Sequence, residues 1–91
     1  MANIGIFKID TNNEYVDLET ITQASFVVDT DYNLQAINSP TTITCCVKST
    51  TPNDGEGFQI FNGEKFGYSP ESGKKLYVKS YGPGYLNIAE A

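Results

Sequence analysis

The residues of this chain that could do chemistry are its carboxylates and its two cysteines, because the 91 residues include no histidine. Histidine is the commonest general base and metal ligand, so its absence excludes Ser-His and Cys-His nucleophile pairs. Asp17 and Glu19 could supply the paired carboxylates of a glycosidase, but acids that alternate along one strand face are more typical of a solvated outer face. We therefore expect no catalytic residue, and a protein that is not an enzyme.

Neither thiol of the adjacent cysteines is expected to be activated. Cys45 and Cys46 would point to opposite faces of a strand, which disfavours a disulfide between them, so we expect both to be reduced and one to lie in the core. Asp29-x-Asp31-x-Asn33 matches the opening of a calcium loop. However, Leu34 stands where that loop needs glycine and Pro40 where it needs a bidentate glutamate, so we expect a turn, with no metal and no cofactor.

Charge and hydropathy exclude two further classes of partner. The net charge is −5, and the chain has six lysines and no arginine, so a nucleic-acid partner is not expected.

Gly55-x-Gly57 and Gly82-x-Gly84 lack the strand–loop–helix context of a phosphate cradle and predict turns. The first eight residues have no long apolar core of a signal peptide, and no apolar run approaches the ~20 residues that span a bilayer, so we expect no membrane partner.

Short runs of alternating apolar and polar residues, separated by Gly, Pro, Asn and Asp, recur along the whole chain at about the ten-residue spacing of a β-sandwich or barrel. The expected strands are residues 4–10, 15–21, 25–30, 32–38, 41–49, 58–62 and 65–68, with two more in residues 73–90. The best helix candidate, Leu18–Phe26, is weakened by its Thr and Ser residues. We predict one all-β domain over residues 1–91, an antiparallel sandwich (jelly-roll or immunoglobulin-like) of about seven or eight short strands, with a small barrel as the competing fold.

Residues 73–90 carry the clearest strand pattern. Leu76 and Val78 alternate with polar residues, and the alternation resumes after Gly82-Pro83-Gly84 with Leu86 and Ile88. This pattern predicts a β-hairpin. A turn centred on Gly82 would place Leu76 opposite Ile88 and Val78 opposite Leu86.

The aromatic residues suggest a contact surface. Phe7, Phe26, Phe58 and Phe66 are expected to fill the core. If Leu76 and Val78 face inward, then Tyr77, Lys79 and Tyr81 form an outward stripe that could bind sugar or protein. The alternative is ordinary cross-strand pairing on a half-exposed sheet. The candidate contact surface comprises Ile4, Ile6, Phe7, Tyr77, Lys79, Tyr81 and Tyr85.

The first ten residues, Met1–Asp10, include an apolar stretch with no charge before Lys8. Such a segment is either an edge strand of its own domain or an arm that adds a strand to a neighbouring protein. A free apolar edge would be prone to aggregate, so we expect some protein surface to cover it.

Several short strings together resemble the small β-sandwich virion proteins of tailed bacteriophages, over roughly residues 23–90. They are Tyr32-x-Leu34-Gln35, Asn38-Ser39-Pro40, the strand Ile43–Val47, Thr51-Pro52, Gly63-Glu64, Gly73-x-x-Leu76-Tyr77-Val78-Lys79-Ser80 and Ile88-Ala89-Glu90. Residues 1–22 carry no part of this match.

The resemblance implies a non-enzymatic structural protein of the virion, most often a capsid decoration or cement protein, or one associated with a tail or fibre. It implies that the protein is assembled in the host bacterial cytoplasm, that its partners are capsid or other virion proteins, and that it self-associates, for example as a trimer at a three-fold position. The alternative function is a carbohydrate- or receptor-binding module of a tail or fibre.

Overall fold

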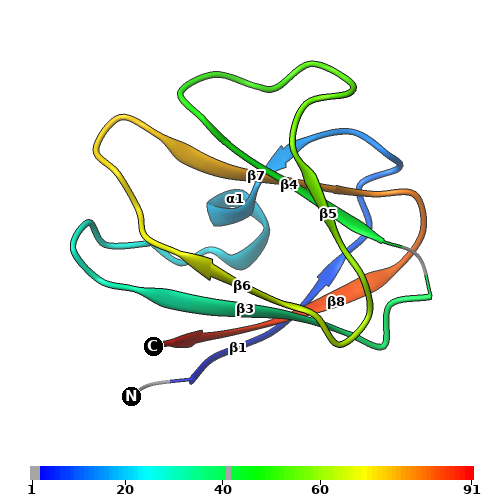
Figure 1. The fold of residues 1–91 in the computed structure, drawn as a ribbon, viewed down its shortest axis with the longest axis horizontal. Coiled ribbons are helices and arrows are strands. Elements are labelled where there is room, and N and C mark those ends of the chain that lie inside the picture. The colour runs from blue at the N-terminus through cyan, green and yellow to red at the C-terminus, as the bar shows by residue number, and fades with distance from the viewer. Residues whose placement is uncertain (1–2, 41) are drawn as a thin grey trace.

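Eight strands form two sheets that face each other (Figure 1). The computed structural model describes residues 3–40 and 42–91. The elements are β1 (Asn3–Ile9), β2 (Val16–Asp17), α1 (Leu18–Thr22), β3 (Tyr32–Ile37), β4 (Ile43–Lys48), β5 (Phe58–Ile60), β6 (Lys65–Tyr68), β7 (Lys75–Ser80) and β8 (Gly84–Glu90).

The order of the strands is that of a jelly roll. One sheet runs β1-β8-β3-β6 and the other β2-β7-β4-β5. Strands from the two halves of the chain pair antiparallel, β1 with β8, β2 with β7, β3 with β6 and β4 with β5. A long hairpin rolled up into two sheets has this arrangement. The predicted all-β antiparallel sandwich is therefore confirmed, and of the two topologies proposed from the sequence the strand order matches the jelly roll.

Alternating side chains build the core between the sheets. In β3, Tyr32, Leu34 and Ala36 are buried, and the residues between them are more exposed. The fully buried side chains are mostly aliphatic, and they come from both sheets and from α1: Ile9, Leu18, Leu34, Ile43, Leu76, Val78, Leu86 and Ile88. Phe7, Phe26 and Phe66 pack against this core from its margins, whereas Phe58, expected in the core, is 40% exposed.

The predicted hairpin between β7 and β8 is wrong. β7 pairs with β4 and β2, and β8 pairs with β3 and β1, so the turn at residues 81–83 crosses from one sheet to the other. Leu76 lies opposite Val47, and Ile88 lies opposite Leu34. Period-two alternation identified the buried face of each strand correctly, but two strands that bury side chains in the same core need not be neighbours in a sheet.

Residues 15–30 also differ from the two strands expected there. β2 has only two residues because the chain turns into α1, whose N-cap is Asp17, with its carboxylate accepting a hydrogen bond from the Glu19 N–H at 3.0 Å. The helix ends at Thr22, and its C-cap is Gln23, which has a left-handed φ of 59°. Residues 25–30 contain no strand. They include a turn in which the Thr30 N–H donates a hydrogen bond to the Val27 carbonyl.

The N-terminal segment is an edge strand of its own sheet for all the residues described. β1 lies beside β8 (Figure 1). The two strands pair from Asn3 to Ile9, with an irregularity between Asn3 and Gly5. Ile9 is fully buried, which anchors the strand to the core. Of the two alternatives for this segment, the structure shows the strand within its own domain; residues 1 and 2 lie outside the described part.

Candidate functional site

Four of the seven candidate contact residues lie on β1 and β8. Ile6 is 58% exposed and points away from the core, opposite Asn87 of β8. Tyr85 is half-buried and lies opposite Lys8 of β1. Ile4 and Phe7 instead pack against the core, so these two residues support β1 rather than offer a surface.

The side chains on the outward side of the β1-β8-β3-β6 sheet, which we name the β8 face, are exposed or half-buried and carry few charges. The register places its side chains in rows across the four strands. They are Ile6, Lys8, Asn33, Gln35, Ile37, Lys65, Tyr85, Asn87 and Ala89. None of these residues is acidic, although the chain has eleven Asp and Glu residues. The face thus combines apolar and amide groups with two lysines.

The predicted outward stripe of Tyr77, Lys79 and Tyr81 is not a surface. Tyr77 and Lys79 are only 8% and 9% exposed, and only Tyr81, at 80%, is open to solvent. The stripe does point away from the core, but other parts of the chain lie over it. Lys79 Nζ sits 4.6 Å from the centre of the Tyr15 ring and 3.5 Å from Asp54. The prediction failed because alternation along one strand says nothing about loops that fold over its outer side.

The loop that covers this stripe, residues 49–57, is fixed in place by several hydrogen bonds. The Tyr15 hydroxyl donates to the Glu56 carbonyl. The Glu56 carboxylate accepts hydrogen bonds from Lys48 Nζ at 3.0 Å and from the Asn53 N–H at 2.7 Å. These two bonds, the backbone one first, lower the pKa of Glu56. The outer side of β4 and β7 is therefore largely occupied by the protein itself.

Both cysteines are free and buried, one on each side of β4. Burial, with a smaller contribution from Cys46, raises the pKa of Cys45 to about 12. Burial also raises the pKa of Cys46, with Glu56 adding to the shift. Both thiols therefore stay protonated at neutral pH, which agrees with the prediction that neither is activated as a thiolate.

Asp17 and Glu19 do not face each other as a catalytic pair would. Asp17 caps α1 and forms an ion pair with Lys75 at 3.0 Å. Glu19 accepts a hydrogen bond from the Phe26 N–H at 2.7 Å. Asp31, from the calcium-like motif, accepts a hydrogen bond from Ser69 at 2.7 Å. Within residues 3–40 and 42–91, no three His, Cys, Asp or Glu side chains gather where they could hold a metal.

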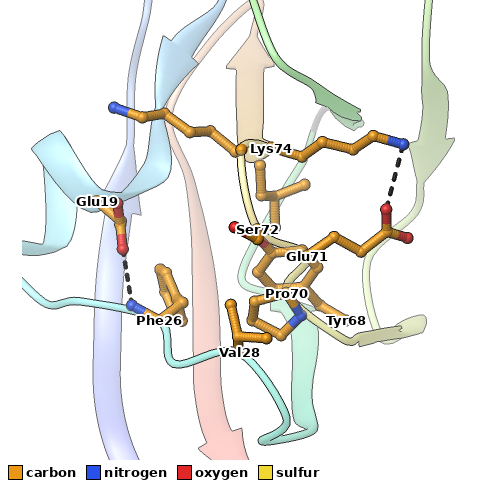
Figure 2. A pocket seen from close by; sticks show the side chains of 11 residues that line it. Glu19, Phe26, Val28, Tyr68, Pro70, Glu71, Ser72 and Lys74 are labelled. Carbon is orange, nitrogen blue, oxygen red and sulfur yellow. Dashed lines mark hydrogen bonds and ion pairs between the residues drawn. The ribbon is translucent and has the colours of Figure 1, made fainter.

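A pocket of about 340 Å³ opens where the segment after α1 meets the β6–β7 connection (Figure 2). Its apolar lining includes Phe26, Val28, Tyr68, Pro70 and Leu76, and its charged lining comprises Glu19, Glu71, Lys74 and Lys75. The Phe26 ring meets the Tyr32 ring edge-on at 5.1 Å and the Tyr68 ring at 5.8 Å, which fixes the aromatic side of the pocket.

Sequence reasoning missed this pocket. Its two halves, residues 19–28 and 68–76, are far apart in the chain, and the sequence pattern predicts strands over much of the first half. No local motif marks either half. The irregular path of residues 23–31 brings the two halves together, and only the rolled topology produces it.

No family model, curated protein or solved structure matches this chain. Among the helices of the described residues, none has the length and apolar character needed to cross a membrane.

Proposed function

We propose that this chain is a non-enzymatic structural protein of a bacteriophage virion, most specifically a capsid decoration or cement protein. The β8 face is the observation that carries the proposal. A broad sheet face with exposed Ile6, half-buried Ile37 and Tyr85, amide groups and no carboxylate among its strand residues suits attachment by contact area. The proposed partners are capsid or other virion proteins and further copies of the chain.

The fold and the distribution of charge also support this proposal. The jelly roll is common in viral capsid domains, an analogy of fold that raises the expectation without establishing the role. The charge of the chain is also unevenly placed, because the β8 face has two lysines and no acid while the net charge is −5. An acidic surface, of a capsid or of another copy, would complement the β8 face.

The alternative, a carbohydrate- or receptor-binding module of a tail or fibre, has less support. Its proposed aromatic platform loses Tyr77 to burial, and Tyr81 is its one strongly exposed tyrosine. Jelly rolls also serve as lectins, so a glycan array is the direct test. Binding that is abolished by Tyr81→Ala would favour the alternative over attachment through the β8 face.

The proposal is tested by assembling particles from variants of the chain. Ile6→Glu places a charge in the β8 face at an exposed position, so we expect a folded protein that is depleted from purified virions by about tenfold or more, as measured by mass spectrometry. Phe61→Glu is the matched control, because Phe61 is 57% exposed and lies outside that face. Absence of the wild-type chain from virions, or equal incorporation of both variants, would refute the proposal.

A further inference from the structure

The lining of the pocket in Figure 2 includes the hydroxyl of a buried tyrosine, Tyr68. Tyr68 is only 4% exposed, and no hydrogen bond joins its hydroxyl to another residue that lines the pocket (Figure 2). The adjacent Tyr32 differs, because its hydroxyl accepts a hydrogen bond from the Val27 N–H at 2.9 Å. A hydroxyl in the lining of a pocket can exchange hydrogen bonds with a ligand there, so Tyr68 is placed to contact one.

The charges around the pocket leave one carboxylate without a cation. Lys74 pairs with Glu71 at 3.2 Å, and Lys75 pairs with Asp17 at 3.0 Å. Glu19 lines the pocket and bonds the Phe26 N–H, but it forms no ion pair within the described residues. These five groups sum to one negative charge.

The neighbouring carboxylates contribute to a raised pKa of Tyr68. Burial raises the pKa of Tyr68 to about 12, and the Glu19 carboxylate is the next largest cause, followed by Asp17 and Glu71. The hydroxyl therefore keeps its proton at neutral pH, and its oxygen remains free to accept a hydrogen bond.

We propose that this pocket receives a basic side chain, lysine or arginine, from a partner protein. The aliphatic stem would lie against Phe26, Val28 and Pro70, as such stems do on apolar surfaces. The cationic head would donate to the Tyr68 hydroxyl and pair with Glu19. The aromatic rings of Phe26 and Tyr68 add a further attraction for a cation. The volume, about 340 Å³, is in the lower range of small-ligand pockets.

This inference adds a second contact to the proposed virion role, and it rests on that role only in requiring a protein partner. The net charge of −5 favours a partner whose contacting segment is basic. The pocket is formed by residues outside the β8 face, so the two proposals fail separately. A chain absent from virions would refute the virion role and leave the solution test of the pocket unaffected.

The test is a titration of the folded protein followed by ¹H–¹⁵N NMR. The probes are Nα-acetyl-lysine amide and Nα-acetyl-arginine amide, with the norleucine and glutamate amides as controls for the stem alone and for the opposite charge. We expect saturable shifts at Glu19, Phe26 and Tyr68 with at least one basic probe, and binding at least about tenfold weaker with either control. Absence of saturable shifts with both basic probes, or equal binding of norleucine, would overturn the proposal.

Tyr68→Phe separates a binding role from a structural one. It should weaken binding of the basic probe about tenfold or more while leaving the midpoint of unfolding unchanged or raised, because the hydroxyl that it removes bonds none of the other lining residues. Tyr32→Phe is the matched control and should lower the midpoint, because the Val27 N–H loses its acceptor. Unchanged probe affinity in Tyr68→Phe would overturn the assignment. Tighter binding of free cadaverine than of both amide probes would replace the partner's side chain with a free polyamine.

Discussion

The buried hydroxyl of Ser80 donates a hydrogen bond to the carbonyl of Ile9 at 2.9 Å. Ser80 ends β7 and Ile9 ends β1, so this bond joins the two sheets. The Ser80 N–H also bonds the Thr11 hydroxyl at 2.9 Å, and the Ser80 carbonyl accepts from the Asn13 N–H at 2.6 Å. One residue thus fastens the chain that leaves β1 to the opposite sheet.

Ser80→Ala should therefore destabilise the fold by about 1–3 kcal/mol, because the link is lost and the Ile9 carbonyl stays buried. Urea unfolding followed by circular dichroism gives the value. Ser69→Ala is the control, since that hydroxyl bonds Asp31 at an exposed site and its loss should cost less than about 0.5 kcal/mol. Equal effects of the two substitutions would contradict the role of Ser80.

Gly57→Ala should destabilise the protein much more than Gly55→Ala. Both glycines have positive φ, 95° and 89°, so both substitutions carry the backbone strain of a left-handed residue. A Cβ at position 57 would also lie 2.5 Å from the Cys45 carbonyl oxygen, whereas one at position 55 would meet nothing within 4 Å. We expect losses of about 2–4 kcal/mol and about 1 kcal/mol respectively, measured by chemical unfolding. Similar losses would show that the loop can move off β4.

Stability should fall as the pH rises above about 9. The ordinary pKa of the Cys45 thiol is 9.0, and burial raises it to about 12 in the folded protein. Between these values the unfolded state holds fewer protons than the folded state, so stability present below pH 9 is lost as the pH approaches 12. One such group lowers the free energy of unfolding by up to about 1.4 kcal/mol for each pH unit in this range.

Cys45→Ala is the variant that isolates this contribution. Its free energy of unfolding, measured from pH 8 to 11 under reducing conditions, should fall less steeply with pH than that of the wild-type protein. The difference in slope should correspond to at most one fewer proton released on unfolding. Its stability at pH 7 should be slightly lower because the substitution leaves a small cavity. Identical slopes for the two proteins would mean that Cys45 ionises in the folded state as readily as in the unfolded one.

Deletion of residues 1–7 should unfold the domain or leave it poorly folded. The deletion removes most of β1 and its pairing with β8, and it also removes the partial burial of Phe7 against the core, which is worth at most about 1.5–3 kcal/mol. Thermal unfolding followed by circular dichroism measures the loss. Ile6→Ser is the control, because Ile6 points outward and should change stability little. A stable, folded product that no longer assembles would instead revive the role of an arm.

Hydropathy pattern and turn residues were enough to predict an all-β sandwich and the approximate bounds of most strands. The buried sides of β7 and β8 also followed from alternation, because successive side chains of a strand point to opposite faces. These properties depend on neighbouring residues in the chain, so a single sequence contains them.

Pairing between strands, by contrast, was decided only in the folded molecule. Leu76 and Ile88 enter the same core from different sheets, and nothing in their spacing distinguishes this from a hairpin. The burial of Lys79 by a loop and the meeting of Phe26 with Tyr68 are likewise long-range events. Local alternation sets which face of a strand is apolar. The arrangement of the whole chain sets what covers that face. The energy that favours this arrangement is spread over contacts between residues distant in sequence, so no local pattern contains it.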